Sequence, residues 1–420
     1  MVKIDLKKTA ALWGCIYLFL TIGPFMFWLL PLSLFLAVSL GVIFVITLKL
    51  WRIGQLVLTK DRVFLFVLFL LYIIHLSLPL WGHSFDWSKI FIFSPLLCII
   101  FWEDCIYYRL FRLFRKWMIF FAFFSIVVFI LFALGATFDT IPHYEIDGGL
   151  ISIVKRNVIY YVYGPVVIAS NCVYPLLDVI FVRACGPFLE PGHLAIILGF
   201  IIAIENILYQ KYSIILLICG FLTFSPAFYI IFILICLYNI YYNCQRKYLF
   251  YLLGILLSIG IIIMLLPETI KEYLWYIIME RRFENTSGDM LDSRSGSEIL
   301  RKYNVFINSA DVFMGRGVAD MDGSDGFLSD YRGFVYSYGI WGMLLFVLIQ
   351  IGIFLRVKLR IVYLFSMFVL LVLLHRAWML GASYLFLLVL LAVHAYSYYN
   401  SSPKNIIKEI WSSGINPFIS

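Results

Sequence analysis

Charged residues are scarce in this chain. Its 420 residues include 32 Lys+Arg and 24 Asp+Glu, or 13% charged, whereas 63% are hydrophobic. A soluble domain is roughly half apolar and about a quarter charged, so this composition excludes an ordinary soluble protein and indicates a polytopic membrane protein. The basic residues flank apolar runs and form no continuous solvent-facing patch, which argues against nucleic acid as a partner.

The sequence also lacks the cysteine and histidine spacings of a metal site. It has eight cysteines, but no CxxC and no Cys/His pattern, so we expect neither a metal nor another cofactor. Most of the cysteines lie in apolar runs. Cys172 and Cys185 fall in a segment that we expect outside the membrane, where they either form a disulfide or remain two buried thiols.

Long hydrophilic stretches are few, and apolar runs fill most of the chain. No small-residue cleavage site follows the first run, so we interpret it as a retained membrane helix. A crossing needs about 20 mostly apolar residues. The sequence predicts an all-α protein with about twelve transmembrane helices, at residues 11–30, 32–50, 63–80, 89–105, 117–135, 191–208, 212–223, 225–243, 248–266, 334–354, 361–377 and 379–398.

The distribution of charge predicts the orientation of these helices. With the N-terminus in the cytoplasm, every short loop on the cytoplasmic side is basic and most of the acidic residues fall outside. Both termini are then cytoplasmic. The chain forms one integral membrane domain, residues 1–420, with two large outer loops at 136–190 and 267–333.

Two stretches do not fit simple crossings. Residues 212–243 are too short for two full crossings and too long for one, so we predict two short helices that turn at Thr223–Pro226. Such a turn at membrane depth survives only against protein or a water-filled cavity. The apolar pieces of 136–190 are interrupted by Gly164, Pro165 and other breakers, so we predict that this segment lies on the interface or re-enters.

Two predicted helices begin on the outer side with Pro at their first position, after Glu190 and after Ser225. Helix N-termini have free N–H groups and bind phosphate. Arg183 lies just before the first start, where a cation is unfavourable for the helix unless an anion lies between them. We therefore predict an anion site of Arg183 and Ser225, although either start could also be an ordinary helix end.

The outer loop 267–333 provides the other candidate arginines. Arg294 and Arg301 are seven residues apart, about two helical turns, and could clamp one oxyanion. Residues 299–310 have the pattern of an amphipathic helix on the outer surface, with Lys302 and Tyr303 beside Arg301. The structural alternative is a solvated face paired with nearby carboxylates.

Single residues complete the candidate site. Arg316, between Gly315 and Gly317, is a weak phosphate or sugar contact, and Arg376 marks the outer turn between the last two helices. Asp325 lies in a turn-rich acidic run that lacks the glutamate of a calcium loop. The candidates for a general base are Glu190, His193 and Asp325, although a lone His in a first helical turn is more often structural.

Four pieces of the sequence carry a resemblance to a known family. They are RACGPFLEPGH at 183–193, FLTFSPA at 221–227, DSRSGS at 292–297 and GFLSDYRGFVYSYGIWG at 326–342. Together with the topology, they resemble the Wzy-type O-antigen polymerases. The resemblance covers the helix layout loosely and residues 183–342 more closely.

The resemblance implies a lipid-phosphosugar-dependent glycosyltransferase of GT-C-like architecture in the bacterial inner membrane. It would transfer a growing glycan from undecaprenyl diphosphate to the non-reducing end of the next lipid-linked repeat unit, on the periplasmic face and without a metal. Periplasmic arginines would hold the diphosphate, and Arg183 and Arg294 match them best. A chain-length regulator and a flippase are the implied protein partners.

Two other functions are alternatives to a polymerase. An O-antigen ligase shares the donor and topology, but ligases rely on a histidine in the large outer loop, and residues 267–333 contain none. A lipid-linked oligosaccharide flippase or transporter places ionisable residues within its membrane helices and often shows repeated halves. The apolar runs here are almost free of charge.

Overall fold

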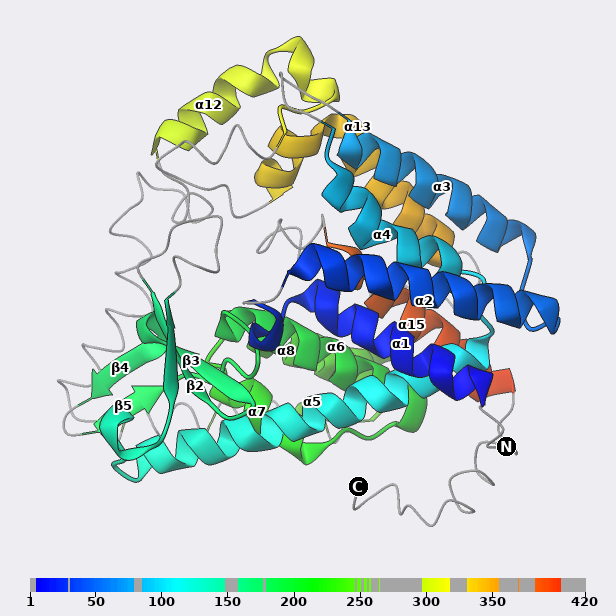
Figure 1. Cartoon of the computed structure of the whole chain (residues 1–420). Helices are drawn as coiled ribbons and strands as arrows, with labels where there is room; N and C mark the ends of the chain where they lie inside the picture. Colours follow the sequence, from blue (N-terminus) through cyan, green and yellow to red (C-terminus); the bar gives the residue numbers. More distant parts are fainter. Residues whose placement is uncertain are drawn as a thin grey trace.

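The computed structural model describes residues 5–28, 31–78, 85–147, 158–176, 179–245, 248–250, 253–254, 257, 264, 297–317, 331–354, 369 and 382–401. The described chain is mostly helical, as predicted (Figure 1). Its α-helices are α1 (Leu6–Ile22), α2 (Leu32–Arg52), α3 (Lys60–Ser77), α4 (Trp87–Ile99), α5 (Asp104–Ala133), α6 (Pro191–Tyr209), α7 (Ile214–Leu222), α8 (Pro226–Tyr242), α12 (Ser297–Ile307), α13 (Tyr331–Phe354) and α15 (Ser383–Ser401).

Four helices of the described chain are long and apolar enough to cross a membrane. They are Leu34–Arg52 within α2, α5, α6 and α13. The side chains that α2, α3 and α5 leave exposed include Phe44, Phe64 and Phe120, which is an unfavourable arrangement in water and a favourable one in lipid. The predicted crossings at 248–266 and 361–377 lie outside the described helices.

Helix boundaries differ from the predicted ones for local reasons. The first helix ends at Ile22 because Gly23 adopts a left-handed conformation (φ 72°) and Pro24 cannot continue the helix. The basic segment from Asp104 belongs to the same 30-residue helix as the predicted crossing 117–135. The two short helices predicted around Thr223–Pro226 are present as α7 and α8.

The centre of the bundle is α6. Almost every residue from Pro191 to Asn206 is buried, and α7, α8 and α15 pack around this helix. A helix that is apolar on all sides is expected at the core of a bundle. Gly199 allows the close approach of α8, because a Cβ there would lie 2.7 Å from the Cγ2 of Ile231.

The segment 136–190 contains strands, which the sequence analysis did not predict. An antiparallel sheet has the order β1 (Tyr144–Asp147), β2 (Ile159–Tyr163), β3 (Val166–Ala169), and a second hairpin joins β4 (Val173–Leu176) to β5 (Val179–Val182). Gly164 (φ 58°) and Pro165 form the two-residue turn between β2 and β3. These residues were interpreted as interruptions of a helix; they end strands instead.

The bundle has two chemically different ends. At one, Lys7 pairs with Glu103 (2.6 Å), Arg62 pairs with Asp104 (2.6 Å), and Arg115 pairs with Glu205. We call this the basic end. At the other, which we call the sheet end, the C-terminal part of α5 packs against β3 and β5 (Figure 1). Asp104 and Arg62 thus lie at one end of the described bundle, and β3 and β5 lie at the other.

Candidate functional site

Arg183 is held at the sheet end by the end of α7. Its Nε donates a hydrogen bond to the carbonyl of Thr223 (2.9 Å), and its Nη2 donates one to the carbonyl of Phe224 (3.0 Å). The last carbonyls of a helix lack helical partners and carry its negative dipole end, so a guanidinium is favourable there. The unfavourable position predicted for Arg183 is thus compensated within the protein.

This anchoring leaves part of the guanidinium unused. A guanidinium has five N–H groups, and the structure pairs two of them. Within the described residues, no carboxylate lies within ion-pairing distance of Arg183. The side chain is half-buried. Arg183 is therefore a fixed cation with donors left for an anion.

The turn after α7 is tightly fixed. Phe224 has a left-handed backbone (φ 46°), and the Thr223 hydroxyl donates to the carbonyl of Gly220 (2.7 Å). The backbone N–H of Ser225 donates to the Thr223 Oγ1 (3.3 Å). Ser225 is only 2% exposed, and its hydroxyl makes no capping bond to α8. The Thr223 hydroxyl thus fixes the turn, and the Ser225 hydroxyl does not cap the helix.

The two predicted helix starts lie at the same end of the bundle. Since α7 is a short helix between them, α6 and α8 run in the same direction and pack together. Pro191 and Pro226 are their first residues, as predicted. The backbone N–H of Ala184 donates to the carbonyl of Leu222 (3.0 Å), which brings Arg183, the residue after β5, to the same turn.

Glu190 and His193 lie on the first turn of α6. Glu190 is the half-buried N-cap residue, and its side chain makes no capping bond. The ring of His193 is 5% exposed and lies between Phe188 (5.0 Å between centroids) and Tyr384 of α15 (5.6 Å). A general base must reach the proton that it takes. Of these two residues, Glu190 is the more accessible.

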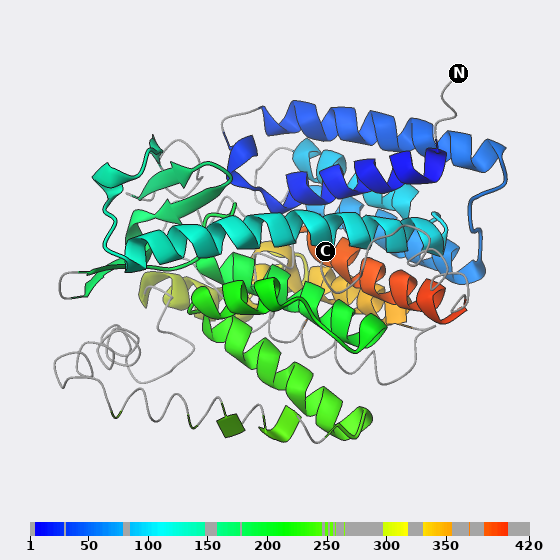
Figure 2. The ribbon, with the colours of Figure 1, turned by 90° about the horizontal axis from the view of Figure 1, so that it is seen from below.

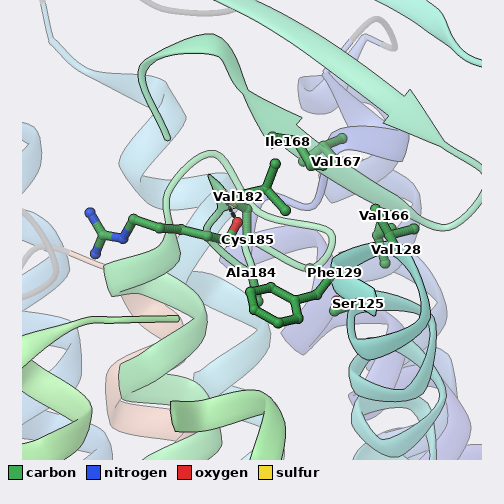
Figure 3. Close-up of a pocket in the computed structure, with 11 residues that line it drawn as sticks. Ser125, Val128, Phe129, Val166, Val167, Ile168, Val182, Ala184 and Cys185 are labelled. Carbon is green, nitrogen blue, oxygen red and sulfur yellow. Dashed lines mark hydrogen bonds between the residues drawn. The ribbon is translucent and has the colours of Figure 1, made fainter. Parts of the chain in front are cut away.

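A small crevice lies beside Arg183, between α5 and the strands (Figure 3). Ser125 and Phe129 of α5, Val167 of β3 and Ala184 line it, as the close-up shows. Its cavity volume of about 10 Å³ leaves room for about one water molecule. A sugar phosphate does not fit there.

Cys172 and Cys185, on either side of the β4–β5 hairpin, are buried thiols that no disulfide joins. The backbone N–H of Arg183 donates to the carbonyl of Cys172 (3.1 Å). A hydrogen bond with the Cys172 thiol, together with burial, raises the pKa of the Cys185 thiol well above its usual value. Of the two arrangements that the sequence left open, the structure has the free thiols.

Arg316 belongs to a separate cluster. Its Nη2 lies 3.1 Å from the Oδ2 of Asp311, and its guanidinium lies over the rings of Phe306 (5.7 Å) and Tyr336 (5.9 Å). Burial lowers the pKa of Arg316, but hydrogen bonds with Tyr336 and Asp311 raise it above its ordinary value. These contacts are those of a structural cation.

The loop that carries Arg316 fills a break in α13. Gly339 has a left-handed φ of 67° within this helix. The carbonyls released by the break accept from the N–H groups of Arg316 (Tyr336 O, 2.8 Å) and Gly317 (Ser337 O, 3.0 Å), and the Nε2 of His75 donates to Tyr338 O (2.7 Å). The freed backbone groups are therefore satisfied, as a broken helix at membrane depth requires.

The amphipathic helix predicted at 299–310 is present as α12, residues 297–307. Arg301 is exposed on it. Tyr303 is buried against Phe306 and Tyr336, so it supports the cluster below the helix. Three further candidates, Arg294, Asp325 and Arg376, lie outside the described residues. Their predicted roles, and the convergence of Arg183 with Arg294, stay predictions.

The sequence analysis missed two features that position residues. Thr223 and the Phe224 carbonyl hold Arg183, and only the helix break at Ser225–Pro226 pointed to this turn. At the basic end, the Asp104 Oδ1 accepts from the Nη2 of Arg62 (2.6 Å) and from the Nδ1 of His394 (2.9 Å). His394 lay within a predicted crossing, where nothing in the sequence marked it as a partner.

Comparison with known proteins adds nothing to the geometry. No protein-family model, no curated protein and no solved structure matches this chain.

Proposed function

We propose that this protein is a polysaccharide polymerase, a glycosyltransferase that acts on lipid-linked repeat units. One observation carries the proposal. Arg183 is fixed to the end of α7, has N–H donors without a protein partner in the described chain, and lies at the end of the bundle where α6 and α8 begin. A fixed guanidinium beside helix N-termini suits a diphosphate leaving group.

The chemistry needs positive charge more than it needs a strong base. The acceptor hydroxyl oxygen attacks the anomeric carbon of the donor, and the bond from that carbon to the diphosphate oxygen breaks. The lipid diphosphate leaves with the electron pair, and the hydroxyl proton passes to a base. Preorganised donors at the developing charge usually provide the largest share of such catalysis. Arg183 takes this role, with Glu190, His193 and Asp325 as candidates for the base.

The proposal places the sheet end in the periplasm and the basic end in the cytoplasm of a bacterial inner membrane. About twelve crossings of GT-C-like arrangement then separate them, with both termini cytoplasmic. The substrate is a glycan on undecaprenyl diphosphate within membrane lipid, and a flippase and a chain-length regulator act beside the enzyme. Four cations that line one cavity at the basic end, Lys8, Arg109, Arg112 and Lys116, support this orientation.

The test compares three variants of the turn that holds Arg183. Arg183→Gln retains a donor for the Thr223 carbonyl but removes the charge, so we expect roughly a hundredfold slower polymerisation, the effect of losing one donor at a developing anion. Arg183→Lys retains the charge but loses the paired N–H donors of the planar guanidinium, so we expect an intermediate rate. Thr223→Val changes the same turn without a charge and reports the structural effect alone.

The readout is a gel of lipopolysaccharide from a deletion strain that carries each variant, with the protein level measured in parallel. A deletion strain with a single repeat on its core supports a polymerase. A core without any repeat supports a ligase or a flippase, which the accumulated lipid-linked intermediates then separate. Wild-type chain lengths in Arg183→Gln at normal protein level would remove Arg183 from the site.

A further inference from the structure

A cavity of about 310 Å³ opens at the basic end, far along α5 from the strands. It lies between α1, α5 and α15, and Figure 2 shows α5 running between the other two helices. Its lining includes four cations and no carboxylate. The cations are Lys8, Arg109, Arg112 and Lys116, with Tyr108 and Tyr398 beside them.

The positive charge of this cavity is only partly compensated. Asp5 pairs with Arg109 (2.8 Å) and lies 4.0 Å from Lys8. Within the described chain, Arg112 and Lys116 have no carboxylate within ion-pairing distance. Neighbouring carboxylates are already engaged elsewhere, as with Glu103 on Lys7. Within the described chain, two of the four cations are thus left without a carboxylate, which is an arrangement that attracts an anion.

The cavity continues into an apolar surface. Arg109, Lys116, Phe120 and Phe123 follow one another at intervals of seven, four and three residues, so they share one face of α5. Both phenylalanines are exposed, and so is Leu12, one turn after Lys8 on α1. A ligand on this face would meet guanidinium and ammonium groups first and then hydrocarbon.

We infer that this cavity binds the phosphate group of an anionic lipid of the adjoining leaflet, with its acyl chains against Phe120, Phe123 and Leu12. The shared chemistry is that of a phosphate oxyanion, which paired arginines and lysines recognise well. Basic pockets between membrane helices at this depth bind anionic lipid headgroups. A free phosphate would use the same cations but would leave the apolar surface unoccupied. The inference does not depend on the proposed function.

The test uses the purified full chain in detergent. Thermal unfolding is followed while phosphatidylglycerol, phosphatidylcholine with the same acyl chains, or sodium phosphate is added. The variant Arg112→Gln/Lys116→Gln removes two cations of the cavity. The control variant Lys49→Gln/Arg52→Gln removes two exposed cations at the same end, on α2, outside the cavity. Native mass spectrometry counts co-purified phosphatidylglycerol, which gives a second measurement.

We expect phosphatidylglycerol to raise the melting temperature of the wild type and of the control variant, and phosphatidylcholine to leave it unchanged. In Arg112→Gln/Lys116→Gln, binding should be about thirtyfold weaker, since each surface cation contributes roughly fivefold. If phosphatidylglycerol raised the melting temperature of all three proteins equally, the cavity would not be the binding site. An equal response to sodium phosphate and phosphatidylglycerol would overturn the lipid as ligand and assign a soluble phosphate.

Discussion

Two arginines show how far a single residue can be interpreted from sequence. Arg183 and Arg316 both lie next to small residues and helix ends, and both were predicted to contact substrate. Within the described residues, Arg183 has two backbone carbonyls and no acid as partners, whereas Arg316 has an aspartate and two aromatic rings. The sequence could not separate them, because the difference comes from partners that the fold brings in.

The contacts of Arg316 predict a structural effect when it is changed. Arg316→Gln removes an ion pair and two cation–π contacts, so we expect a loss of about 1–2 kcal/mol in stability. Asp311→Asn should cost less, and the double variant should be little worse than Arg316→Gln, because both changes remove the same pair. Thermal unfolding and protein level measure this loss of stability, while cells with the remaining folded protein should make polysaccharide of normal chain length. Loss of the polysaccharide in a variant of wild-type stability would show instead that Arg316 contacts the substrate.

At the scale of helices and strands, the predictable part was set by hydropathy. Long apolar runs gave the positions of most described helices, and Ser225–Pro226 marked the turn between α7 and α8. The strands of 136–190 were missed because short apolar pieces fit a broken helix or a strand equally well. Pairing across the Gly164–Pro165 turn, which the sequence does not show, decides between them.

The break in α13 was also missed, because Gly339 lies in an apolar run that reads as one helix. Its role depends on a second segment. A Cβ on Gly339 would lie 2.3 Å from the carbonyl oxygen of Phe313, and one on Gly315 would lie 2.5 Å from that of Ser337. The two backbones therefore cross at van der Waals contact, with a glycine on each side of the crossing.

This crossing predicts that Gly339→Ala is severely destabilising. The substitution places a side chain against backbone and keeps a backbone conformation (φ 67°, ψ −177°) that is essentially confined to Gly and costs about 1–3 kcal/mol in other residues. We expect little folded protein, measured as the monodisperse fraction after solubilisation. The matched control is Gly41→Ala in α2, where a Cβ meets nothing within 4 Å. That change should be neutral or stabilising by about 1 kcal/mol, since Ala favours a helix more than Gly does. Equal yields of the two variants would contradict the crossing.

At the scale of the whole molecule, ion pairs between distant segments gather at one end of the described bundle. At this basic end, Lys7, Arg62 and Arg115 pair with Glu103, Asp104 and Glu205. The predicted alternation of the helices across a membrane stays a prediction, and the proposed orientation is open to direct measurement. Exposed positions at the two ends offer a matched pair of probes.

Cys244 follows α8 near the basic end and is the exposed one of the eight cysteines. In intact cells, a membrane-permeant maleimide should label it, whereas a charged, impermeant maleimide should not. Tyr144 of β1, at the sheet end, is 53% exposed. Tyr144→Cys in a Cys244→Ser background should react with both reagents, because the inner membrane does not separate the periplasm from a charged reagent.

The opposite pattern would invert the bundle and place Arg183 on the cytoplasmic face, away from any periplasmic glycan. Labelling of both positions by the impermeant reagent would mean that no membrane lies between the two ends.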